Sequence, residues 1–227
     1  MKGIVTFSCV FGMMMTLTAT AKLSNDEVKR LSESATVLNE LRTTPDNGIP
    51  QDLWAKAECV VVIPSLKKAA FVFGGEYGSG VMSCKNGSVW SAPVFMQLAK
   101  GSVGFQIGAQ STDLVLLVMN RRGMEKMLGN KVTLGADMSI AAGPVGRTAS
   151  AATDAQLNAE ILSYSRSQGL FAGVDLTGGV LKPDTDSNED TYGKGIRTAD
   201  IVERRTVIVP PQADVFMKAL QRAPVSN

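Results

Sequence analysis

The chain has 227 residues, 44% of them hydrophobic, which is enough for one medium-sized domain with a real core. Its 23 Lys and Arg nearly balance its 21 Asp and Glu, and this balance argues against a dedicated nucleic-acid binder, which has a strong basic excess. The chain contains no histidine, so Ser-His-Asp triads, Cys-His pairs and histidine-ligated zinc are excluded.

Residues 1–21 have the pattern of a secretory signal peptide. Lys2 supplies a short positive region, Gly3 to Leu17 are mainly apolar, and the letters ATA at 19–21 fit a cleavage site with small residues. The apolar part is short for a bilayer span, so an uncleaved anchor is the weaker alternative. We expect an exported product, periplasmic or extracellular and peripheral to a membrane, with one domain at 22–227.

An amphipathic helix is predicted from Ser24 to Arg42. Ser24 and Glu27 have the spacing of a capping box, and apolar residues recur on one face at helical spacing. Such a helix either covers a sheet or lies in a membrane interface. The apolar positions are Val28, Leu31, Ala35, Leu38 and Leu41.

Short apolar runs separated by turn signals dominate from Cys59 onward. Cys59–Ile63 and Ala69–Phe73 are predicted as two strands on either side of Pro-Ser-Leu-Lys-Lys, and DLVLLVM at 113–119 as a fully buried strand. Glycines within such strands mark bulges, bends or close backbone approaches. The pattern predicts an α+β fold: a curled, mainly antiparallel, glycine-rich β-sheet or half-barrel with N- and C-terminal helices.

Cys59 and Cys84 are the only cysteines after the leader. Their spacing is not C-x-x-C, and two cysteines without histidine make a poor zinc site. An oxidising exported compartment favours a structural disulfide between them. The alternative is a pair of buried free thiols that act as small hydrophobic residues.

An acidic segment from Lys182 to Gly193 offers a weak calcium candidate, because oxygen ligands occur at alternate positions. An EF-hand loop starting at its first aspartate needs glycine and glutamate where Glu189 and Gly195 stand. A solvated acidic loop or a helix N-terminus is therefore the preferred interpretation. The candidate ligands are Asp184, Asp186, Asn188 and Asp190.

Motifs of catalysis and of phosphate binding are missing. The glycine-rich FGGEYGSG at 73–80 lacks the G-K-[ST] ending of a phosphate loop, and no G-x-S-x-G occurs. We therefore expect neither an enzyme nor a cofactor, although an enzyme that uses carboxylates remains a third-ranked alternative.

Four long segments in a fixed order resemble the SYLF-domain family. They are AECVVVIPSLKKAAFVFGGEYGSGVMSC, WSAPVFMQLAKGSVGFQIGAQSTDLVLLVMNRRGMEKML, KVTLGADMSIAAGPVGR and AEILSYSRSQGLFAGVDLTGGVLKPDTDSNEDTYG. The resemblance implies a lipid-binding module, because eukaryotic members bind phosphoinositides, some associate with actin, and an N-terminal amphipathic helix is linked to membrane contact. The matching positions of this chain are Val28, Lys29, Arg30, Leu31, Ala35 and Leu38.

The sequence is thus interpreted as a non-catalytic, exported lipid-binding or membrane-associating domain that binds anionic lipid head groups or apolar ligands. Further basic contacts are expected from Lys67, Lys68, Arg121 and Arg122. The alternative is an envelope structural or protein-interaction module without lipid binding. The expected partners are anionic membrane lipid and an envelope protein; neither nucleic acid nor, for a bacterial exported chain, actin is expected.

Overall fold

The computed structural model describes residues 23–42, 48–70, 73–103, 108–145, 158–167 and 170–222. The predicted signal peptide at 1–21 lies outside these residues. The elements are α1 Asn25–Arg42, α2 Gln51–Lys56, β1 Cys59–Ala70, β2 Phe73–Asn86, β3 Val89–Trp90, β4 Val94–Val103, β5 Gly108–Val118, α3 Arg121–Met127, β6 Val132–Thr133, β7 Ile140–Ala142, β8 Ile161–Ser167, β9 Leu170–Gly173, β10 Val180–Pro183, α5 Thr185–Tyr192, α6 Thr198–Val202, the 3₁₀ turn η2 Pro211–Ala213 and α7 Asp214–Gln221.

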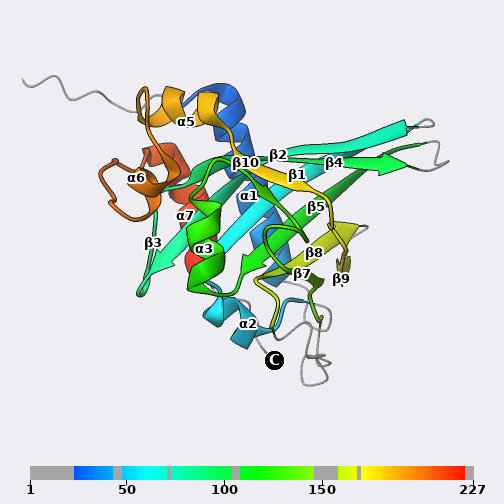
Figure 1. Cartoon of the computed structure of the whole chain (residues 1–227). Coiled ribbons are helices and arrows are strands. Elements are labelled where there is room, and N and C mark those ends of the chain that lie inside the picture. Colours follow the sequence, from blue (N-terminus) through cyan, green and yellow to red (C-terminus); the bar gives the residue numbers. More distant parts are fainter. Residues whose placement is uncertain are drawn as a thin grey trace, which may run out of the picture.

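One curled sheet organises the domain. Its strand order is β6-β10-β4-β2-β1-β5-β8-β7, with β3 paired to β2 and β9 paired to β8. Among the described strand pairs, β7–β8 is parallel and the others are antiparallel. The long strands β1, β2, β4 and β5 form a narrow arm that projects from the helices (Figure 1). The predicted α+β fold with a mainly antiparallel sheet and terminal helices is confirmed.

Both faces of the sheet centre are covered. Along β1, Val60 and Val62 join a core shared with α1, α2 and α7, whereas Val61 and Ile63 join a second core with α3 and α6. This alternation follows from the two-residue period of a strand. It also explains why residues 114–118 of β5 are all apolar, since they serve the two cores in turn.

The Pro-Ser-Leu-Lys stretch bends β1 without breaking it. The prediction of two separate strands is wrong, because β1 is one strand from Cys59 to Ala70, and its register shifts between Val62 and Lys67 against β2. Ser65 at this bulge has a positive φ of 55°, a conformation that costs energy for a residue with a Cβ. Gly80 lies opposite, where a Cβ would be 2.0 Å from the Val62 carbonyl oxygen. The expectation that strand glycines mark close approaches is confirmed here.

Other element boundaries also differ from the sequence predictions. The segment after Asp184 is the helix α5 rather than a loop, as the helix-N-terminus interpretation allowed. Between residues 132 and 142 the chain forms the two short strands β6 and β7, and Gly135 between them has a φ of 86°. Residues 206–209 belong to no strand.

Helix α1 begins with the predicted capping box. The Ser24 amide donates to Glu27 Oε2 at 2.6 Å, and the Glu27 amide donates to Ser24 Oγ at 3.4 Å. The apolar stripe of α1 then packs on the sheet and on α7. Within the part of the chain that the structure describes, no helix is both long and apolar enough to cross a bilayer.

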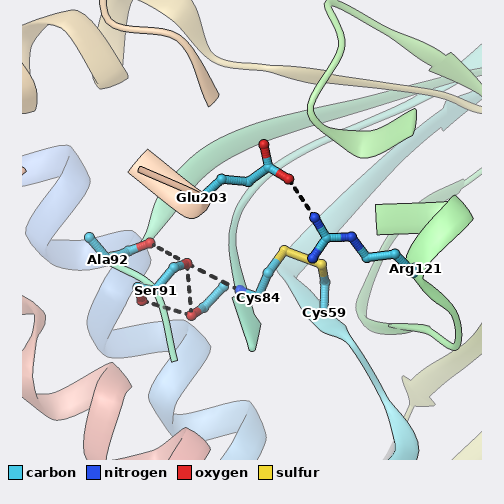
Figure 2. Close-up of a disulfide and its surroundings, with 7 residues drawn as sticks. Cys59, Cys84, Ser91, Ala92, Arg121 and Glu203 are labelled. Carbon is cyan, nitrogen blue, oxygen red and sulfur yellow. Dashed lines mark hydrogen bonds and ion pairs between the residues drawn. A yellow bond between two sulfur atoms is a disulfide. The ribbon is translucent and has the colours of Figure 1, made fainter. Parts of the chain in front are cut away.

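A disulfide joins Cys59 and Cys84, so the predicted pairing is confirmed (Figure 2). The two residues face each other in the register of β1 and β2, with Cα atoms 3.9 Å apart. Both are buried in the second core. Next to them, the Cys84 amide donates to Ser91 Oγ at 3.2 Å, which continues the strand contacts toward β4.

Candidate functional site

A groove of about 390 Å³ opens between the N-terminal half of α1 and the β1–β2 bulge. It lies where the long strands leave the cover of α1. Its basic lining residues are Lys29, Arg30 and Lys67. These residues are 38 positions apart in the sequence at most, and the docking of α1 beside the bulge brings them together.

The three basic groups differ in how firmly they are held. The Lys29 side chain is 70% exposed, and its Nζ lies 3.8 Å from Glu33 Oε1. Lys67 is exposed at the bulge. The Arg30 side chain is only 22% exposed and donates to Asp184 Oδ2 at 2.5 Å. Two exposed lysines therefore stand beside one guanidinium held by an ion pair, and exposed cations attract anions.

Asp184 holds the Arg30 guanidinium in place through an ion pair. Burial raises the pKa of the Asp184 carboxyl, but hydrogen bonds from Arg30 and Ser187 outweigh it and hold the pKa below its usual range. The Ser187 hydroxyl donates to Asp184 Oδ2 at 2.9 Å, and Arg30 also donates to Ser187 Oγ at 3.2 Å. This buried ion pair ties α1 to the start of α5.

Hydroxyl groups complete the lining of the groove. Tyr77 is 50% exposed, and the Ser79 hydroxyl donates to its phenolic oxygen at 3.4 Å. The Ser65 amide donates to Asp113 Oδ1 at 2.9 Å, which holds the bulge open toward the groove. Two carboxylates also line it, so the ligand must tolerate negative groups as well as positive ones. The remaining members are Asp26, Glu33, Pro64, Gly78 and Ser111.

The apolar residues predicted to contact lipid are instead placed against protein. Leu31, Ala35 and Leu38 are at most 2% exposed and belong to the core under α1, and Val28 packs partly buried beside them. Neither Leu31 nor Leu38 could become glutamate without disturbing the fold, because both side chains pack in the core that α1 shares with the sheet and α7. Their role as lipid contacts would require α1 to leave this position.

The other predicted basic residues lie outside the groove. Lys68 follows Lys67 on β1 and pairs with Glu76 at 3.3 Å. Arg121 and Arg122 lie on α3, which covers the opposite face of the sheet. Arg121 bonds Glu203 at 2.8 Å beside the disulfide (Figure 2), and Arg122 lies 3.6 Å from Glu160.

The four predicted calcium ligands do not lie on one side of the segment that carries them. Because the segment is a helix, residues two positions apart point to opposite sides: Asp184 and Asn188 are buried, while Asp186 and Asp190 are exposed. Asn188 instead holds β4, with its amide nitrogen and oxygen both bonded to the Phe95 backbone at 2.9 Å. Among the described residues, no cluster of three or more Cys, Asp or Glu is arranged to hold a metal ion.

Sequence reasoning identified three of the eleven residues that line the groove and missed the others. Ser65, Tyr77, Ser79 and Ser111 come from three strands, and their meeting depends on the register of β1 with β2 and β5. The one available signal was Pro-Ser in the middle of an apolar strand, since proline inside a strand marks a bulge or an edge.

The described part of the chain is thus an α+β domain whose curled sheet carries a surface groove lined by lysines, an arginine and hydroxyls. Comparison with known proteins shows the family to which this domain belongs. Residues 99–223 match the family model Ysc84, described as "Las17-binding protein actin regulator". The chain belongs to this family, whose domain is the SYLF domain.

Eukaryotic relatives align over most of the chain. A fission yeast SH3 domain-containing protein is 37% identical over 177 residues, which are 76% of this chain and 40% of that protein. Protein YSC84 of budding yeast is 33% identical over 180 residues, 78% of this chain and 38% of its own length. The human SH3 domain-containing YSC84-like protein 1 is 34% identical over 163 residues, 71% and 47% of the two chains.

These relatives are longer proteins, and the chain spans about 40% of the length of the first two. The family description names a binding protein and regulator rather than an enzyme, which is consistent with the expected non-catalytic role. The expectation that actin is not a partner is not supported, because the family description names actin regulation. Actin is therefore a candidate partner.

Proposed function

We propose that the chain is a non-catalytic domain that binds anionic lipid head groups in the groove between α1 and the β1–β2 bulge. One observation carries this proposal: three of the basic residues predicted for lipid binding, Lys29, Arg30 and Lys67, line the same groove. The groove also supplies hydroxyl donors suited to phosphate oxygens.

In this account α1 stays docked when lipid binds. Undocking would expose the buried leucines of α1 and the core beneath it to water, and burial of each such side chain is worth about 2 kcal/mol. Binding is then mainly electrostatic, with about 1 kcal/mol for each basic group near an anionic surface. Affinity should therefore fall as salt increases.

An exported location is part of the proposal. The buried Cys59–Cys84 disulfide supports it, because disulfides persist in oxidising compartments and are rare in the cytosol. The lipids available there would be anionic phospholipids at a membrane surface.

Charge reversal in the groove tests the lipid-binding proposal. Flotation of residues 22–227 with phosphatidylglycerol vesicles should be reduced about tenfold by Lys29→Glu with Lys67→Glu, since two favourable contacts become repulsive. The matched control is Lys131→Glu with Lys194→Glu, which makes the same charge change at exposed sites outside the groove. Equal losses in both double variants would reduce the effect to net charge and reject the groove as the site.

A second candidate function is protein binding in actin regulation, favoured by the family to which the chain belongs. Purified Las17 and actin filaments should then bind the chain in pull-down and co-sedimentation assays. Binding of either protein with no flotation on any vesicle would favour this second function over the first.

A further inference from the structure

A second surface of the domain exposes aliphatic side chains beside arginines. Ile208 is 76% exposed, Val209 41% and Val215 45%. They account for three of the six large hydrophobic residues that are most exposed in the described part of the chain, and they fall within eight positions. We call this surface the α6–α7 edge and define it as Arg204, Arg205, Ile208, Val209 and Val215.

The backbone around the α6–α7 edge forces these side chains outward. Val207 packs against the second core, and Pro210 is buried two positions after Ile208. Arg205 has a positive φ of 50°, one of two such non-glycine residues in the described part. Pro210 and Pro211 each fix their own φ. The segment is thus held at both ends, and the exposure of Ile208 and Val209 is built into the fold.

The charge of this surface is positive. The Arg204 side chain is 61% exposed and bonds Asp200 at 2.8 Å, and Arg197, 64% exposed, shares the same carboxylate. The exposed Arg205 donates to the Val89 carbonyl oxygen at 2.8 Å, which leaves its charge uncompensated by a carboxylate there. Arg197 and Arg204 therefore share Asp200, whereas Arg205 donates to a carbonyl oxygen and stands three positions before Ile208.

We propose that the α6–α7 edge inserts Ile208 and Val209 into an anionic membrane interface while its arginines contact the lipid phosphates. The inference rests on the lipid-binding function proposed above and adds a second contact to it. Projecting aliphatic side chains next to cations suit a lipid interface, where the apolar groups enter the acyl boundary and the arginines stay at head-group level. A water-soluble acidic partner would need the arginines but not the isoleucine.

The position of the edge fits a contact separate from the long hairpin arm. In Figure 1, α6 and the segment leading to α7 lie beside β3, on the side of the molecule opposite to the arm. A shallow hollow of about 440 Å³ next to the edge is lined by Val209, Pro210, Pro211, Asp214 and Met217. Its mainly apolar wall extends the surface available to acyl chains.

A tryptophan reporter tests this contact on the full chain. Trp54 and Trp90 are 3% and 8% exposed, and their emission, recorded from the unmodified chain with the same vesicles, is subtracted as background. In Ile208→Trp the new indole should shift to shorter wavelength with phosphatidylglycerol-containing vesicles and be quenched by brominated acyl chains. Leu170→Trp, at a residue that is 59% exposed on β9, is the matched control and should show neither change.

A loss-of-function pair complements the reporter. Ile208→Ser with Val209→Ser should weaken vesicle binding roughly tenfold, because apolar area no longer enters the interface, whereas Leu170→Ser should leave it unchanged. Exposed positions are chosen so that the fold is retained, and an unchanged thermal midpoint confirms it.

The outcomes separate this inference from the groove proposal. Groove-dependent flotation without any change of the Ile208→Trp emission overturns the inference and leaves the groove proposal standing. An equal emission shift in Leu170→Trp also overturns the inference. So does an emission shift of Ile208→Trp that depends on protein concentration in the absence of vesicles, because it would show that a second copy of the chain covers the edge. No flotation of the unmodified chain removes both proposals.

Discussion

At the residue scale, Arg30 connects the groove to the stability of the domain. Its guanidinium lines the groove and also neutralises Asp184, which is 6% exposed. Removing one partner of a buried ion pair leaves an uncompensated charge and costs about 3 kcal/mol or more. Arg30 is therefore a poor residue for testing lipid binding, whereas the exposed lysines Lys29 and Lys67 can be changed without this penalty.

Asp184 should make stability depend on pH at the acid end. The pKa of Asp184 lies below its ordinary value of 3.8, so its contribution is complete above that value and is lost as the pH falls through the folded-state pKa. When the pH is lowered from about 5 to about 3, the free energy of unfolding, measured with urea, should fall less in Asp184→Asn than in the unmodified chain. Asp186→Asn, which changes an exposed carboxylate of the same helix, should behave like the unmodified chain; equal pH profiles for all three would contradict the role assigned to Asp184.

At the element scale, α1 is part of the core. Leu38 is 1% exposed and packs in the cluster shared with α7. Its replacement by alanine should lower the free energy of unfolding by about 2–5 kcal/mol, measured by urea unfolding. Ser32→Ala on the exposed side of α1 is the control and should change it by less than about 0.5 kcal/mol. A small effect of Leu38→Ala would indicate that α1 does not stay docked.

The disulfide is the second element-scale constraint. It ties the first residue of β1 to β2 and closes a loop with a sequence separation of 25. Loop-closure entropy predicts that Cys59→Ala with Cys84→Ala lowers the free energy of unfolding by about 3 kcal/mol. A reducing agent should lower the thermal midpoint of the unmodified chain and leave that of the double variant unchanged; a midpoint insensitive to reduction in both would argue against a stabilising bond.

At the scale of the whole molecule, more of the fold than of the candidate site could be predicted from the sequence. The capping box of Ser24 and Glu27, the two-sided apolar pattern of β5 and the Cys59–Cys84 pairing follow from local spacing and composition. The cap and the strand pattern need only neighbouring residues, and the disulfide was favoured because two cysteines follow the leader of a chain expected to be exported. They were predictable for these reasons.

The groove required tertiary information. Lys29 and Lys67 meet because α1 docks beside a bulge whose position depends on the register of β1 against two neighbours. Nor did the sequence distinguish a helix that covers the sheet from one that lies on lipid, since the same apolar stripe serves both. The burial of Leu31 and Leu38 settles which surface the stripe contacts in this structure.

The central claim is that this domain binds anionic lipid mainly by charge with α1 docked. The most direct measurement is co-flotation of residues 22–227 with neutral phosphatidylcholine vesicles and with phosphatidylglycerol vesicles, each at low and high salt. The account predicts flotation with the anionic vesicles alone, weakened by salt because counterions screen exposed lysines. Absence of flotation under every condition, or salt-insensitive flotation with both kinds of vesicle, would contradict it.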